Sequence, residues 1–143
     1  MNLTYNNQTG FLNKVLYDEL GTCGGKSIYR IVGALLFRCP DGSVIEVPDS
    51  FQTDFASVPR LPFIYTMWGD RAHREAVLHD FVYCYDSNPI LLRSEADSLF
   101  KIAMISRNQP SYIYNPMYAG VRVGGWKAYH KRSVQHQFTL DCP

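Results

Sequence analysis

The spacing of apolar residues changes close to residue 70, and this change constrains the fold more than any other feature of the sequence. Residues 27–39 are rich in β-branched and aromatic side chains, and residues 44–47 alternate in the manner of a strand. After Asp70 the apolar residues recur at the spacing of an amphipathic helix. This order of elements predicts an α+β fold, in which an N-terminal β-hairpin or ribbon precedes a small three-helix bundle.

Prolines, glycines and short polar runs divide the chain into segments of one expected domain. The turn sequence Pro-Asp-Gly-Ser at residues 40–43 would join the two strands of the hairpin. Prolines at positions 48, 59 and 62 would keep the stretch that follows irregular or extended. The expected segments are a polar N-terminal segment (1–26), the hairpin (27–48), an irregular segment (49–69), a helical part (70–132) and a C-terminal tail (133–143).

Three helices are expected in the helical part. Asp70 can cap the first helix, which the Asp-Ser-Asn-Pro sequence at residues 86–89 would end. Ser94 can cap the second, and residues 108–110 would end it. The third is expected over residues 115–132, where three glycines weaken it.

Length, composition and charge narrow the class of protein. A chain of 143 residues with 46% apolar residues has the size of one domain and can bury a core. A net charge of +1 gives no long-range field for nucleic acid, which we do not expect as a partner. No apolar run reaches the roughly 18 residues of a membrane span, and no signal-peptide core is present. We therefore expect a protein made in the cytoplasm, with no integral membrane span.

Two apparent motifs carry no chemistry. The four cysteines form no Cys-x-x-Cys pair, so free thiols are expected and no zinc knuckle or thioredoxin-like site is indicated. Residues 21–27 nearly match a phosphate-binding loop, but the first glycine is replaced by Leu20 and the loop precedes a strand instead of opening a helix. Nucleotide binding is therefore not expected.

One cluster of polar residues has the spacing of a catalytic site. His79 and Tyr83 are four residues apart and would share a helix face, with Asp80 about 100° round the same helix. Asp97 begins the next helix, which a short loop would lay antiparallel to the first. A carboxylate on one ring nitrogen fixes the tautomer of a general base and tunes its pKa.

Four blocks of sequence occur in a fixed order: FQTDFASVPR at residues 51–60, HDFVY at 79–83, ADSLF at 96–100 and YAGVRVG at 118–124. Together with Met104, they resemble a domain family of unknown function found in tailed phages and prophages. The resemblance covers about residues 44–126. It implies a bacteriophage or prophage protein that is located in the virion and has other virion proteins as partners.

The two helical blocks are also similar to the calcium-dependent phospholipases that cut the sn-2 ester, in their bacterial and parvoviral forms. This resemblance implies that His79 is the general base, that Asp97 orients it, and that Tyr83 is a hydrogen-bonding neighbour. It therefore also implies that an imidazole nitrogen of His79 lies within roughly 2.6–3.2 Å of Asp97. It implies calcium as a cofactor, held by Asp80, with Asp54 or the backbone carbonyl groups around Ala56 completing the site. The glycine-rich calcium loop of those enzymes has no counterpart before His79, since Gly69 is the only glycine between Val58 and Leu78.

The same residues also have structural interpretations. Asp97 lies three residues after Ser94 and would complete a capping box. His79 would be a hydrogen-bonded core histidine, and Asp80 would pair with Arg60 or Arg93.

The irregular segment would pack against the helix that carries His79. Ser57 and Arg60 would then form a cleft wall or a structural network, with Arg60 meeting Asp54 or Asp80.

Three functions follow from these interpretations. The first is a hydrolase that acts on the host cell envelope, with a lipid ester as the favoured substrate. The second is a non-enzymatic structural component of the phage tail, baseplate or portal region. The third is a zinc peptidase-like enzyme that would use His73, His79 and a carboxylate, although the spacing of six residues between the histidines does not place them on one helix face.

Overall fold

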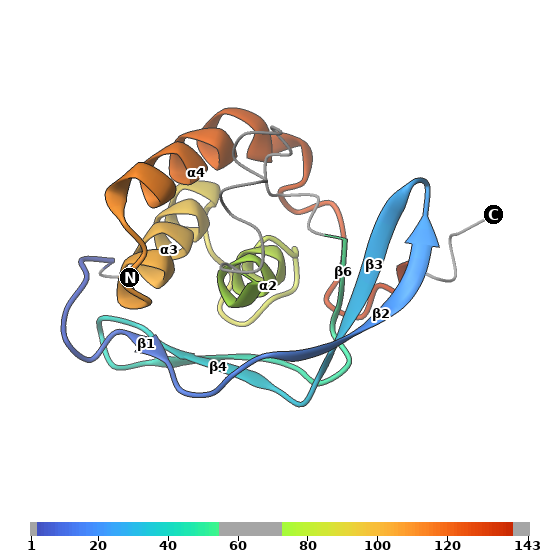
Figure 1. The fold of residues 1–143 in the computed structure, drawn as a ribbon, viewed down its shortest axis with the longest axis horizontal. Coiled ribbons are helices and arrows are strands. Elements are labelled where there is room, and N and C mark those ends of the chain that lie inside the picture. Colours follow the sequence, from blue (N-terminus) through green and yellow to red (C-terminus); the bar gives the residue numbers. More distant parts are fainter. Residues whose placement is uncertain (1–2, 55–72, 139–143) are drawn as a thin grey trace.

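The computed structural model describes residues 3–54 and 73–138, and within them strands come first and helices follow (Figure 1). The α+β class is therefore confirmed. Two antiparallel sheets are present, with strand orders β1-β4-β5 and β2-β3-β6. The strands are β1 (Gly10–Phe11), β2 (Leu16–Cys23), β3 (Lys26–Val32), β4 (Leu35–Arg38), β5 (Val44–Val47) and β6 (Gln52–Thr53).

The single strand expected over residues 27–39 is two strands in different sheets. Strand β3 pairs with β2 and β6, whereas β4 pairs with β1 and β5. Gly33 lies between them with φ of 80°, a conformation that residues with a Cβ rarely adopt. The Asp49 side chain accepts a hydrogen bond from the Gly33 backbone N–H at 2.8 Å, which fixes this corner.

The N-terminal segment contains more structure than its polar sequence predicts. It forms strands β1 and β2, two elements that the expected division of the chain did not include. Gly24 and Gly25, both with positive φ, form the hairpin turn between β2 and β3, so the near match to a phosphate-binding loop is a β-turn. The hairpin expected around residues 40–43 is confirmed by the pairing of β4 with β5.

The three helices differ from their expected bounds. Helix α2 is described over His73–Val82, and its expected start at Asp70 lies outside the described residues. Helix α3 (Arg93–Ser106) begins one residue before the expected cap, Ser94. Helix α4 (Ser111–Gly124) begins earlier than expected, includes Pro116, and gives way to the short helix η2 (Gly125–Lys127).

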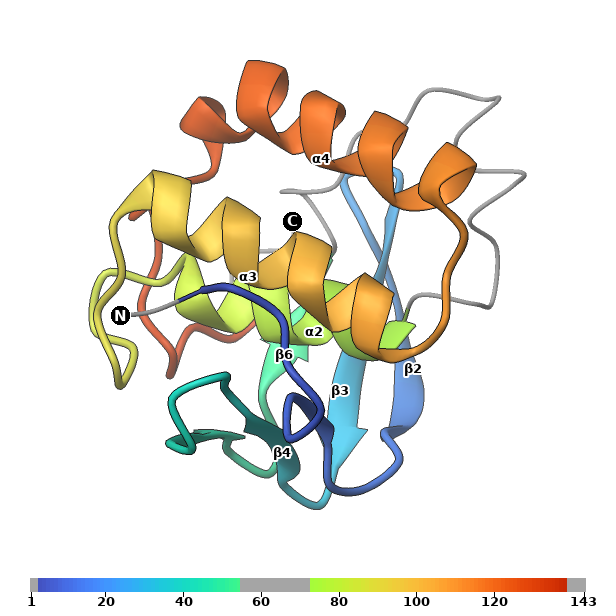
Figure 2. The same ribbon diagram turned by 90° about the vertical axis from the view of Figure 1, so that its left-hand side faces the viewer.

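The expected three-helix bundle is not confirmed. Helix α3 contacts both α2 and α4, and α2 also contacts β4 and β5. Figure 2 shows the resulting order, from the strands through α2 and α3 to α4. Because α2 lies between the strands and α3, every residue from Glu75 to Val82 is buried. This position brings three ionisable residues of α2 into the interior, namely Glu75, His79 and Asp80.

Two apolar clusters surround these residues. The larger joins β3, β4 and β5 to α2 and α3, and the smaller joins α3 to α4. Burying an ionisable group costs free energy of folding unless the group is paired or hydrogen bonded. The buried side chains of Glu75, His79 and Asp80 therefore need polar partners.

Cys39 and Cys84 are free and buried, as expected, whereas Cys23 is disulfide-bonded and corrects the expectation of free thiols. No helix among the described residues is long and apolar enough to cross a bilayer.

Candidate functional site

Asp97 of α3 is the centre of a buried polar network. Its side chain has no exposed surface, and Oδ1 lies 2.8 Å from Nε2 of His79. The Tyr83 hydroxyl also donates to Oδ1. Arg122 Nη1 donates to Oδ2 at 2.9 Å, and Arg93 Nη1 lies 3.7 Å from the same oxygen. The expected contact between His79 and Asp97 is therefore confirmed, and one carboxylate contacts residues of α2 and α4 as well as its own helix.

This contact assigns the tautomer of His79. An ionised carboxylate only accepts hydrogen bonds, so Nε2 of His79 carries the hydrogen that Asp97 receives. In the neutral imidazole the lone pair is then on Nδ1. The ring itself is fully buried, with the Tyr83 ring centroid 4.1 Å away and that of Phe100 at 4.8 Å.

The network shifts the pKa values of its acids in opposite directions. Burial raises the pKa of Asp97, but its hydrogen bonds to His79, Tyr83 and Arg122 and the charge of His79 outweigh burial, so its pKa lies below the ordinary value. Burial, followed by the hydrogen bond to Asp97 and its charge, raises the pKa of Tyr83 well above its ordinary value. Tyr83 therefore remains a neutral donor and Asp97 an ionised acceptor.

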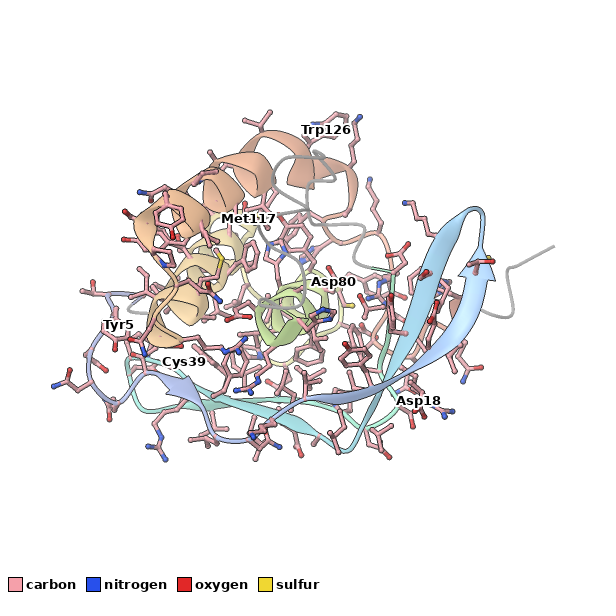
Figure 3. The ribbon with its side chains drawn as sticks, viewed as in Figure 1. Tyr5, Asp18, Cys39, Asp80, Met117 and Trp126 are labelled. Carbon is pink, nitrogen blue, oxygen red and sulfur yellow. The ribbon has the colours of Figure 1, made fainter. Side chains whose placement is uncertain are left out.

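Asp80 faces a different part of the structure from His79. It is 4% exposed, and the Thr53 hydroxyl of β6 donates to its Oδ2. Asp80 also lines an open cleft of about 640 Å³, together with Tyr83 and Asp54. Figure 3 labels Asp80 beside α2. The described start of the irregular segment thus contacts the helix that carries His79, as expected.

The residues expected to hold calcium supply an incomplete set of ligands. Within the ranges that the structure describes, no group of three or more His, Cys, Asp or Glu side chains could hold a metal ion. Asp54 and Asp80 supply carboxylate oxygens, the donors that calcium prefers, but only two residues contribute them. The carbonyl groups near Ala56 lie outside the described residues.

The structure decides between several of the alternatives. The Glu95 side chain, and not Asp97, accepts the backbone N–H of Leu92 at the start of α3, at 3.0 Å. Arg93 pairs with Asp97, not with Asp80. Ser57 and Arg60, expected as a cleft wall or structural network, lie outside the described residues.

Two members of the site were missed by the sequence reasoning. Arg122 belongs to the YAGVRVG block, and its position within a recognisable motif was the signal that could have identified it. Gly125 is the other. A Cβ at Gly125 would collide with the Tyr83 hydroxyl and lie 3.2 Å from its Cζ, so only glycine leaves room for this tyrosine.

A second buried ion pair lies nearer the start of α2. Glu75 is fully buried, and Nη1 of Arg107 donates to its two carboxylate oxygens at 3.2 and 3.1 Å. Burial raises the pKa of Glu75 to about 7, against the charge and hydrogen bonds of Arg107. This pair joins α2 to the residue that follows α3.

Comparison with known proteins gives one match. The family model described as "Protein of unknown function (DUF1353)" matches residues 29–121, a range that includes His79, Asp97 and most of α4. No curated protein and no solved structure matches the chain.

Proposed function

The chain belongs to the DUF1353 family of proteins of unknown function, whose description assigns no activity, and we propose from its geometry that it is an ester hydrolase with His79 as general base. The observation that carries the proposal is the 2.8 Å hydrogen bond between His79 Nε2 and Asp97 Oδ1. A base needs a fixed tautomer and a stabilised cationic form, and this carboxylate supplies both.

The proposed reaction begins with a water molecule that attacks an ester carbonyl. Nδ1 of His79 takes a proton from this water as the new C–O bond forms. Asp97, held ionised by its donors, stabilises the imidazolium. The same proton then passes from Nδ1 to the departing alkoxide when the ester C–O bond breaks, which yields an acid and an alcohol and regenerates neutral His79. Tyr83 fixes the carboxylate through its hydroxyl.

The substrate and setting rest on the sequence resemblance. We propose a bacteriophage or prophage protein, associated with the virion, that acts on an ester of the host envelope, with a lipid ester favoured. Purification of intact virions followed by detection of the protein tests the setting. Its absence from virions would contradict the proposed location and leave the chemistry to the enzyme assay.

A second function is favoured by a specific observation. His79 has no exposed surface, and Asp97 is surrounded by four donor side chains. A network of this kind fixes three helices relative to one another without any chemistry. The protein would then be a non-enzymatic structural component of the tail, baseplate or portal region.

His79→Asn separates the two functions. Loss of a general base lowers the rate of hydrolysis by about 10²–10⁴-fold. The assay uses p-nitrophenyl butyrate and phospholipid micelles, at a temperature where circular dichroism shows the variant folded. His73→Asn, on the same helix, is the control and is expected to keep the rate, whereas its loss of activity would favour the zinc peptidase-like alternative. No hydrolysis by the native protein, or an unchanged rate in His79→Asn, would leave the structural function.

Calcium is a separate proposal with its own measurement. An ion held by Asp80 and Asp54 would raise the melting temperature of the native protein with the logarithm of its concentration. Asp80→Asn would remove this dependence. A melting temperature that is independent of calcium in both proteins would contradict a calcium site.

A further inference from the structure

The cleft beside Asp80 is lined by more cations than anions. Its described lining includes four cationic and two carboxylate side chains, although the net charge of the whole chain is only +1. The cations come from the start of β3 and from η2 and the segment after it. These charged residues are Lys26, Lys127, Lys131 and Arg132, with Asp54 and Asp80.

None of the four cations forms an ion pair within the described part of the chain. The ion pairs found there involve Arg30, His79, Arg93, Arg107 and Arg122, and none involves a cation of the cleft. Lys127 and Lys131 are exposed. Like charges that gather around one cleft repel each other, so an anion bound there would stabilise this arrangement.

Arg132 is the fixed member of the set. Its Nη1 donates to the Gln52 carbonyl at 2.9 Å, and its guanidinium carbon lies 4.7 Å from the Phe51 ring centroid and 4.9 Å from that of Phe138. Two aromatic faces and one hydrogen bond therefore hold the charge in place. Nη2 is buried and has no hydrogen-bond partner among the described residues. A buried donor without an acceptor is costly, and a ligand oxygen would satisfy it.

We propose that this cleft binds the phosphate group of a phosphate ester. A phosphate presents several oxygens in different directions, which suits cations that come from separate parts of the chain, and a guanidinium is well suited to oxyanions. Asp54 and Asp80 line the same cleft and would repel a ligand that is anionic throughout. The ligand therefore combines one phosphate group with an uncharged remainder. This inference goes beyond the proposed function, because it concerns binding and requires no turnover.

The test compares two variants of equal charge. Lys127→Gln/Lys131→Gln removes two cleft charges, and Lys14→Glu changes the net charge by the same amount at an exposed position outside the described lining. Inorganic phosphate and dimethyl phosphate are titrated by NMR, and vesicles of ether-linked phosphatidylglycerol, which contain no cleavable acyl ester, are tested by cosedimentation. Circular dichroism confirms that both variants are folded.

We expect binding that is roughly tenfold weaker in the double lysine variant and nearly unchanged in Lys14→Glu. This pattern with the soluble phosphates identifies a small phosphate ester as the ligand, and the same pattern with vesicles alone identifies a lipid headgroup. Equal weakening of the two variants, or no binding in any arm, overturns the inference. His79→Asn is expected to bind phosphate like the native protein, so a failure of the hydrolase proposal and a failure of this one give different results.

Discussion

Asp97→Asn is the substitution that tests the central network most directly. The substitution keeps the shape of the side chain but removes its negative charge. It also replaces one carboxylate oxygen with an NH₂ group, which cannot accept the hydrogen bonds that neighbouring side chains donate to Asp97. Breaking a buried ion pair costs about 3–5 kcal/mol, and we expect the lower value because Arg122 and Arg93 keep a quarter to a third of their side-chain surface exposed. Since unfolding entropy is about 0.3 kcal/mol per kelvin for a chain of 143 residues, a loss of about 3 kcal/mol lowers the melting temperature by about 10 °C.

The assay is thermal and urea unfolding of Asp97→Asn beside the native protein, with Asp18→Asn as control. Asp18 pairs with Arg30 at 3.4 Å on the surface, where its side chain is 58% exposed, so its loss is expected to cost less than about 0.5 kcal/mol.

The difference in stability between the native protein and Asp97→Asn also depends on pH. The folded pKa of Asp97 is lowered, so its contribution is complete above the unfolded pKa of about 4 and is lost as pH falls through the folded value. The native protein should therefore approach the variant in stability at low pH. Equal stability of native and Asp97→Asn at pH 7 would refute the network.

Two further predictions concern other residues of the core. Gly125→Ala must displace the Tyr83 ring and is expected to destabilise the protein by about 1–3 kcal/mol, whereas Gly124→Ala, where a Cβ meets nothing within 4 Å, is expected to be neutral or stabilising by up to about 1 kcal/mol; equal melting temperatures would contradict the close approach. The folded pKa of Glu75 is raised to about 7, so its contribution is complete below the unfolded pKa of about 4.5 and is lost as pH rises through 7, a loss of about 3 kcal/mol. In urea unfolding at pH 5 and pH 8, Glu75→Gln should lack this decline, and parallel stability curves for the two proteins would argue against it.

The helical contacts of the site could be predicted from the sequence because they depend on local spacing. Tyr83 directly follows α2, four residues after His79, so both side chains reach the same carboxylate once α3 lies alongside. The contact of Arg122 could not be predicted in this way. Arg122 reaches Asp97 from α4, 25 residues further along the chain, and no period within a single helix encodes such a contact.

The strands show a different limit. Strand β2 is largely exposed on both of its faces. Apolar and polar residues therefore do not alternate along it, and its sequence lacks the two-residue period that identifies a half-buried strand. Residues 27–39 carry a strong strand signal, but Gly33 turns the chain from one sheet to the other within it. The β-branched and aromatic residues identified this stretch as strand. The division of the stretch between two sheets depends on the backbone conformation of Gly33, which the residue pattern does not reveal.

The burial of α2 from Glu75 to Val82 affects how the protein can be engineered. Each of its positions from Glu75 to Val82 is also a packing position, so a library that varies His79 or Asp80 for new chemistry will repack the interior as well. Most members of such a library would be lost to misfolding before selection could act on them. The cleft residues Lys127 and Lys131 are exposed, so substitutions there do not change the packing of the interior. Binding specificity is therefore more readily redesigned at these two lysines than on α2.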